Sequence, residues 1–211
     1  MKKTLLKVAV LALTLMQTAL ASECPSIQLP SSFRAEEEFF SIGTDYTFVS
    51  RGSRIASVEE RTLNWTTTFE LFNASHERVA TAQERFLSWG TTIDVFDCNN
   101  VKIGTLSEEL FTSLFNTYSR FHIYNGQRQE IGLSEREEFF ATDFTITPRA
   151  GRGLIRMHRP ALTFFTHYWD VTLSGNPSQI VDPRLILFIP AFKTSSERHY
   201  ESSHSNDDSS H

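Results

Sequence analysis

The sequence predicts a mostly β protein: a single antiparallel β-barrel of about twelve strands that encloses an apolar helix near its C-terminus. Three hairpin-like units with one spacing indicate a sheet made of consecutive antiparallel strands. One segment late in the chain is apolar throughout, and a helix that is hydrophobic on every side must be buried. So long a series of strands favours closure into a barrel, because closure leaves no unpaired sheet edges.

The chain of 211 residues begins with a secretory signal peptide at residues 1–21. Three lysines precede an apolar stretch at 8–15, and residues 19–21 supply the small side chains that a signal peptidase requires. Residues 22–35 are predicted to be an extended N-terminal segment. Export predicts a periplasmic or secreted protein, and no later stretch approaches the ~18 apolar residues of a membrane-spanning helix.

The chain without its signal peptide is acidic. Its 17 Lys and Arg residues oppose 25 Asp and Glu residues, which gives a net charge of about −8. This excess argues against a nucleic-acid partner, because the phosphate backbone attracts a basic surface. Cys24 and Cys98 would both meet an oxidising compartment after export, and we expect them to form a disulfide. A catalytic thiol is the alternative, but it needs a supporting histidine that the sequence does not place.

The repeated unit is an alternating apolar strand, an Asn or Asp, a short polar turn, and an apolar residue followed by Gly or Ala. It occurs at residues 69–80, 93–104 and 121–132, and each time the apolar residue of the second strand follows ten positions after the first residue of the unit. Alternation with aromatic and β-branched residues predicts a strand, and the Asn or Asp starts a turn. Weaker hairpins are expected at 46–55 and 144–157, with a further strand at 168–173.

Two segments break this pattern and predict helices. From Ser107 to Tyr118, apolar residues at helical spacing follow a serine cap and early acidic residues, as in a short amphipathic surface helix. Asp182-Pro183 is a favourable start for a second, buried helix. Its expected core residues are Leu185, Ile186, Phe188, Ile189 and Phe192. Pro190 should kink or end this helix, and the polar residues 194–211 should be disordered.

Two hairpin units and the end of the chain carry a family resemblance. The residues concerned are Phe69–Asn73 with Val79-Ala80, Phe121–Gly126 with Glu130–Gly132, and Trp169–Val171 followed by Val181–Leu185. This layout resembles the tubby C-terminal superfamily, in particular its LURP-one-related branch, which includes relatives of phospholipid scramblases. The resemblance covers residues 36–193 and implies a twelve-stranded barrel around a central hydrophobic helix. The better-known relatives act at cytosolic membrane faces, whereas this chain carries an export signal.

A basic cluster is the candidate binding site. Its members are Arg149, Arg152, Arg156, His158 and Arg159, with no acidic residue from 148 to 168. Arg156 and His158 are two residues apart and share a strand face, where guanidinium donors suit phosphate or carboxylate groups. The cluster therefore predicts an anionic partner, either an anionic membrane surface or a small anionic ligand. The alternative is that acidic neighbours such as Glu36–Glu38, Glu135, Glu137 or Glu138 pair with these arginines.

No local motif for catalysis or metal binding is present, and no cofactor or metal is predicted. The leading hypothesis is a non-catalytic binding or structural module that works outside the cytoplasm. A carrier with an apolar lumen, as in lipocalins, is one alternative. An enzyme whose functional residues are dispersed along the sequence is the other.

Overall fold

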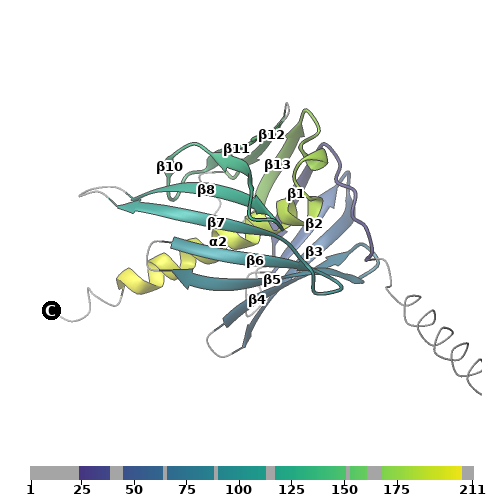
Figure 1. Cartoon of the computed structure of the whole chain (residues 1–211), viewed down its shortest axis with the longest axis horizontal. Coiled ribbons are helices and arrows are strands. Elements are labelled where there is room, and N and C mark those ends of the chain that lie inside the picture. Colours follow the sequence, from purple (N-terminus) through teal and green to yellow (C-terminus); the bar gives the residue numbers. More distant parts are fainter. Residues whose placement is uncertain are drawn as a thin grey trace, which may run out of the picture.

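The structure is a computed structural model that describes residues 24–38, 45–63, 66–87, 90–112, 117–150, 153–160 and 168–205. These residues form thirteen strands, a 3₁₀ turn and one long helix (Figure 1). The strands are β1 (Ser32–Glu37), β2 (Tyr46–Ser50), β3 (Ser53–Leu63), β4 (Thr66–Asn73), β5 (Arg78–Leu87), β6 (Gly90–Asp97), β7 (Lys102–Thr112), β8 (Thr117–Asn125), β9 (Glu130–Ser134), β10 (Glu137–Glu138), β11 (Asp143–Pro148), β12 (Leu154–His158) and β13 (Tyr168–Ser174). The turn η1 (Pro177–Gln179) and the helix α2 (Pro183–Ser205) follow.

The strands close into an antiparallel barrel. Strands β1 to β8 pair in sequence order, β13 pairs with β1 and β12, and β9 joins β11 to β8. Twelve strands thus form the ring, while β10 pairs with β8 beyond the end of β9. In register, Phe33 of β1 lies opposite Val171, and His122 of β8 lies opposite Leu133. The predicted mostly β barrel of about twelve strands with a buried C-terminal helix is confirmed.

The three predicted repeats share one turn. In the first, Asn73 Oδ1 accepts hydrogen bonds from the backbone N–H groups of Ser75 (3.0 Å) and Glu77 (2.9 Å), and His76 has a φ of 60°. The same arrangement recurs at Asp97 with Asn99, Asn100 and Val101, and at Asn125 with Gln127, Arg128 and Gln129. The strand register shifts just before each of these turns. The Asn or Asp side chain that begins each turn therefore stabilises its hairpin.

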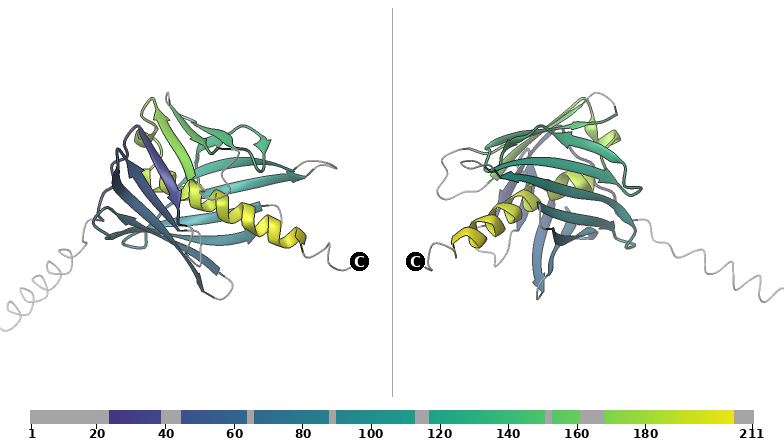
Figure 2. Two further views of the ribbon diagram at one scale, coloured as in Figure 1. Left: turned by 180° about the vertical axis from the view of Figure 1, so that it is seen from behind. Right: turned by 60° about the vertical axis from the view of Figure 1, so that its left-hand side comes forward.

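The helix α2 runs lengthwise through the barrel (Figure 2), and its expected core residues are all buried. Asp182 caps it as predicted, because its Oδ1 accepts a hydrogen bond from the Arg184 N–H (2.9 Å). The wall comes close at Gly104, where a Cβ atom would lie 2.8 Å from Leu185 Cδ1 and 2.5 Å from the Tyr124 carbonyl oxygen. A side chain at position 104 would therefore displace either the helix or the neighbouring strand.

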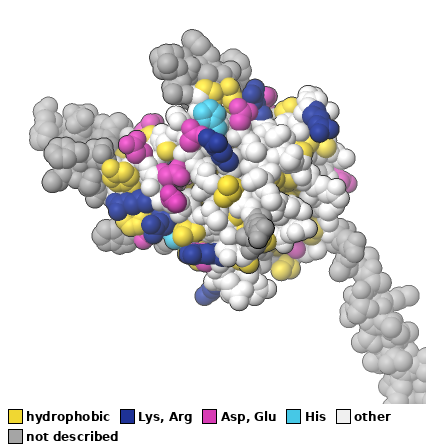
Figure 3. Space-filling view, turned by 90° about the horizontal axis from the view of Figure 1, so that it is seen from above, with side chains coloured by type: hydrophobic (Ala, Val, Ile, Leu, Met, Phe, Trp, Pro, Cys, Tyr) yellow, Lys and Arg dark blue, Asp and Glu magenta, His cyan; other side chains and the backbone are white. Residues whose placement is uncertain are grey.

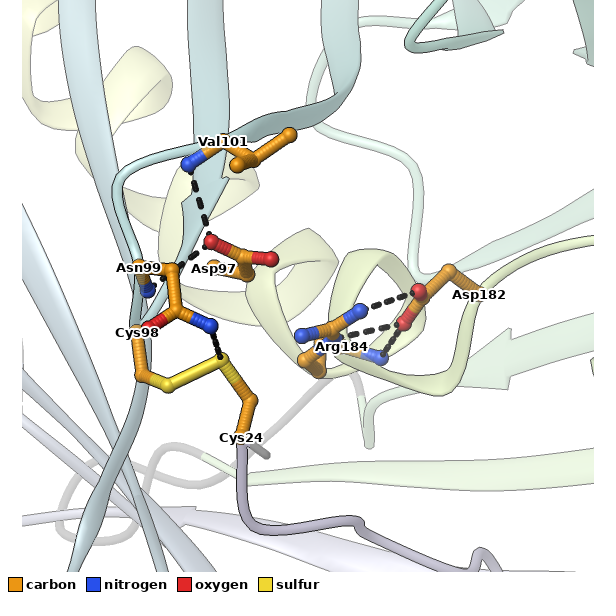
Figure 4. Close-up of a disulfide and its surroundings, with 7 residues drawn as sticks. All are labelled: Cys24, Asp97, Cys98, Asn99, Val101, Asp182 and Arg184. Atoms are coloured by element: carbon orange, nitrogen blue, oxygen red, sulfur yellow. Dashed lines mark hydrogen bonds and ion pairs between the residues drawn. A yellow bond between two sulfur atoms is a disulfide. The ribbon is translucent and has the colours of Figure 1, made fainter. Parts of the chain in front are cut away.

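A disulfide ties the N-terminal segment to the second repeat turn (Figure 4). Cys24 and Cys98 are joined with their Cα atoms 5.6 Å apart, as predicted. The bond closes a loop of 74 residues, which limits the freedom of the unfolded chain and stabilises the fold by about 4 kcal/mol. It also fits a compartment more oxidising than the cytoplasm.

The predicted surface helix at 107–118 is wrong. Residues up to Thr112 continue β7, and Thr117 begins β8. Phe111 and Tyr118 are seven residues apart and would share a helix face, but here they lie opposite each other across the hairpin. The Arg136 guanidinium lies over both rings, at 4.6 and 4.9 Å. Helical spacing and a hairpin pair can thus produce the same pattern.

The end of the chain also differs from expectation. The helix continues through Pro190 to Ser205, and Thr194, Ser195, Ser196 and Glu197 are buried rather than disordered. Barrel walls on several sides hold the helix together where proline removes one backbone hydrogen bond. At the other end, β1 begins at Ser32, ahead of the predicted domain start at 36. The predicted signal peptide at 1–21 and residues 206–211 lie outside the described residues.

Among the residues described, no helix combines the length and the hydropathy needed to cross a bilayer.

Candidate functional site

The outward-facing members of the basic cluster lie against carboxylates. Arg149 Nε donates to Glu130 Oε1 (2.5 Å). Two residues of β12 contact Asp143: Arg156 Nη2 lies 3.4 Å and His158 Nδ1 lies 3.0 Å from its Oδ1. Arg149 and Arg156 are therefore paired with acidic neighbours, as the alternative interpretation predicted. The partners are Glu130 and Asp143 rather than the glutamates named there. The hydrogen bond and charge of His158, and those of Arg156, lower the pKa of Asp143 although its slight burial acts in the opposite direction.

The cluster is divided between two environments. Arg156 and His158 share the outer face of β12 as predicted, with side chains 67% and 49% exposed. Arg159 is only 21% exposed, and its Nη1 and Nη2 donate to the two oxygens of Glu197 at 2.6 and 2.9 Å. Arg152 lies outside the described residues. Figure 3 shows basic and acidic side chains interspersed over one face of the molecule, with no continuous positive patch there.

The interior of the barrel carries a group of charged side chains that is separate from the basic cluster. Strands β1, β3, β5 and β7 run in the same direction, and each brings one glutamate inward near its end; we call this the polar end of the barrel. In three of them a small residue, an aliphatic or alanine side chain and the glutamate alternate: Ala56, Val58 and Glu60; Ala80, Ala82 and Glu84; Gly104, Leu106 and Glu108. The small residues line the part of the lumen that holds the apolar half of α2, and the glutamates surround its polar half.

Lys193 pairs with one of these glutamates inside the barrel. Its Nζ lies 2.6 Å from Glu108 Oε1, 2.6 Å from the Phe139 carbonyl oxygen and 3.5 Å from Glu197 Oε1. The ammonium group also lies 4.1 Å from the centre of the Phe139 ring. Two hydrogen bonds and a second nearby carboxylate thus compensate the charge of a nearly inaccessible lysine, as burial requires.

Glu84 is a buried carboxylate with few interactions to stabilise its negative charge. Its side chain is inaccessible, and among the described residues neither oxygen accepts a hydrogen bond of good geometry, although the Thr67 side chain lies nearby. His199 Nδ1 lies 4.0 Å from its Oε1, beyond hydrogen-bonding distance. Burial raises the pKa of Glu84 to about 7 although the nearby Thr67 side chain opposes the change, and the negative charge of Glu60 acts in the same direction as burial. This carboxyl group therefore changes charge close to neutral pH.

A cavity of about 470 Å³ opens beside the polar half of α2. The helix lies closest to β3 through β7, which leaves space on the side of β1 and β13. The cavity is lined by Glu37, Phe140, Thr142, Arg159, Pro160, Tyr168, Thr194, Glu197, Arg198 and Glu201. One member of the predicted cluster, Arg159, is among them. The cavity thus combines charged groups of both signs with two aromatic side chains.

Two ion pairs form part of the cavity wall. Arg159 binds Glu197 through both oxygens and stacks over the Trp169 ring at 4.7 Å. Arg198 pairs with Glu37 Oε1. Burial raises the pKa of Glu197 even though Lys193 and Arg159 oppose this change, and burial lowers the pKa of Arg198. In the described part of the chain, no three His, Cys, Asp or Glu side chains are placed to hold a metal ion.

Sequence reasoning missed most of this site. The inward glutamates could have been found from their alternation with small and aliphatic residues in the strands at 53–63, 78–87 and 102–112. Glu197, Arg198 and Glu201 gave no such signal, because they lie in a segment whose composition is typical of disorder. No protein-family model, curated protein or solved structure matches the chain, and its resemblance to the tubby C-terminal superfamily stays a prediction.

Proposed function

We propose that the protein is a non-catalytic binding module that works in the periplasm or outside the cell, and that its ligand occupies the cavity at the polar end. The position of α2 is the observation that carries this proposal. The helix fills the apolar half of the lumen, yet leaves about 470 Å³ between its polar half and the wall at β1 and β13. Small-molecule sites in proteins commonly have volumes of roughly 300–1,000 Å³.

Two other functions receive less support. A carrier of apolar ligands needs an open apolar lumen, but Leu185, Phe188 and Phe192 occupy that space. An enzyme would be expected to present a group with a pKa near neutrality to its substrate. Glu84 is such a group, but it does not line the cavity.

The proposal moves the binding site from the outer face of the sheet to the interior of the barrel. Outward-facing Arg149 and Arg156 have carboxylate partners, which reduces the positive charge they present to an anionic membrane. Arg159 contributes to the cavity instead, where two aromatic rings and charged groups of both signs converge.

Nuclear magnetic resonance on the isotope-labelled protein, with its disulfide intact, tests this proposal. The probes are agmatine, glutarate and taurine, which are respectively cationic, anionic and zwitterionic. We expect at least one of them to shift the backbone signals of Thr142, Tyr168 and Thr194. A larger side chain in Thr142→Trp should fill the cavity and abolish the response, while Thr147→Trp on the exposed face of the following strand, β11, should preserve it.

Three flat titrations would contradict the proposal. So would shifts that map to the outer face of the barrel, or shifts that persist unchanged in Thr142→Trp.

A further inference from the structure

We infer that the ligand of this cavity is a small organic cation that carries an ammonium or guanidinium group. The inference rests on the proposed function, because it assigns a chemical class to the ligand of the same site. It follows from the charges that the cavity leaves unsatisfied, and it reverses the sign expected from the arginine cluster.

Both arginines of the cavity already have carboxylate partners. Arg159 uses two of its donors on Glu197 and packs its guanidinium plane over Trp169. Arg198 is engaged by Glu37. An anionic ligand would have to compete with Glu37 or Glu197 for these guanidinium groups, and a carboxylate that lost its partner would be left unpaired in a mostly buried position.

The unsatisfied groups of the cavity are negative. The Glu37 side chain is only 6% exposed, and its Oε2 has no hydrogen-bond partner among the described residues. Glu201 is exposed on the next turn of α2 after Glu197, and it acts on Arg198 through its charge. A cation in this cavity would place its charge beside Glu37 and Glu201, with the Arg159 and Arg198 pairs left in place.

The surroundings of the cavity also favour a cationic ligand. The carboxyl groups that face the lumen at this end, apart from Glu84 with its raised pKa, are Glu37, Glu60, Glu108, Glu137 and Glu197, and the basic groups among them are Arg159, Lys193, Arg198 and the half-exposed His199. The excess of carboxylates in a partly enclosed space concentrates a negative potential at the cavity. Phe140, 45% exposed at the cavity wall, offers an aromatic surface on which an organic cation can rest.

Calorimetric titration of the disulfide-bonded protein at low ionic strength tests the ligand class. Agmatine, which carries a guanidinium and an ammonium on a short apolar chain, should bind more tightly than glutarate. Glu37→Gln and Glu201→Gln should each weaken agmatine binding about fivefold. Glu36→Gln is the matched control, because it removes the same charge from the neighbouring residue of β1, which faces outward. We expect it to change the affinity less than twofold.

Three results would overturn the inference, and they differ in what they imply for the proposed function. Tighter binding of glutarate than of agmatine would refute the cationic class but leave the cavity as a binding site. An equal loss of affinity in Glu36→Gln would show general attraction of cations to an acidic protein rather than a site. Binding of neither probe would refute the ligand class and, together with silent magnetic resonance titrations, the proposed function as well.

Discussion

The two halves of the barrel lumen are filled by one helix, but different forces hold each half. From Leu185 to Phe192, α2 buries apolar side chains against apolar wall residues, and Phe121 packs edge-on against Phe192 with ring centres 5.3 Å apart. From Lys193 to Glu197, the same helix buries charged and polar groups that need specific partners on the wall. Apolar burial tolerates many neighbours, whereas buried charge tolerates few, so the two halves should respond differently to substitution.

The largest effect is expected in the apolar half. Phe188→Asp would remove a fully buried ring and place an unpaired carboxylate among apolar side chains. We expect a loss of more than about 5 kcal/mol in the free energy of unfolding, enough to unfold a typical domain. Urea unfolding followed by tryptophan fluorescence would measure it. The control Phe140→Asp makes the same change at an exposed position and should cost little; equal losses would mean that α2 is not enclosed.

Truncation after Lys193 tests whether the polar half belongs to the fold. Removal of Thr194 leaves the buried Tyr46 hydroxyl without its partner at 2.7 Å, and removal of Glu197 leaves Arg159 without its carboxylate. We expect a loss of about 4 kcal/mol, chiefly from the unpaired guanidinium. Truncation after Ser205 should leave the melting temperature unchanged. If the shorter truncation melts like the parent, the polar half makes no contribution to stability.

The contrast between the halves also explains what sequence reasoning could reach. Burial of Leu185 to Phe192 follows from composition alone, because any enclosed helix of that composition must be surrounded. The polar residues after Lys193 resemble a solvated tail. Their burial depends on glutamates that lie far away in the sequence, on strands whose inward face is known only once the register is known.

Breaking the buried Lys193–Glu108 pair should lower the free energy of unfolding by a smaller amount, and a second substitution should restore most of it. Lys193→Met leaves Glu108 inaccessible and without its counter-ion, and should cost between about 3 and 4 kcal/mol. The double variant Lys193→Met/Glu108→Leu removes both charges and should recover most of that loss, since apolar side chains of similar volume can replace a buried pair. Chemical denaturation of the parent, Lys193→Met, Glu108→Leu and the double variant gives the coupling energy directly. A double variant no more stable than Lys193→Met would show that this half cannot be made apolar.

The arginine cluster shows the same limit of sequence reasoning at the surface. Alternation along β12 correctly placed Arg156 and His158 on one face. It could not identify Asp143 as their partner, because that pairing depends on the register between β11 and β12. Nor could it show that Arg159, the residue after the strand, turns towards Glu197 on α2.

Glu84→Gln should stabilise the protein, in a direction opposite to the other charge changes in the polar half. The pKa of Glu84 is raised from 4.5 to about 7, so the folded protein holds a proton that the unfolded chain releases. Stability from this group is therefore complete below pH 4.5 and is lost as the pH rises through 7. At pH 8, Glu84→Gln should be more stable than the parent by about 2 to 3 kcal/mol, and at pH 4.5 the two should agree.

Melting temperatures across this pH range would measure the difference between the two proteins. Since Glu137 and Glu197 also have raised pKa values, the parent alone cannot isolate one group, but subtraction of the variant can. A constant difference from pH 4.5 to 8 would mean that Glu84 does not titrate there.

The smallest effect is expected outside the lumen, where a charge pair remains in contact with water. Arg156 is 67% exposed and lies 3.4 Å from Asp143, so Arg156→Gln should change the free energy of unfolding by less than about 1 kcal/mol. Arg159→Gln makes the same substitution three residues later, where it would strip a mostly buried Glu197 of two hydrogen bonds. It should therefore cost clearly more, and the gap between the two variants should persist at high salt because water and ions screen only the outer pair. Equal losses, or a gap that closes in 1 M salt, would place both arginines in the same environment and remove the distinction between the outer face and the polar end.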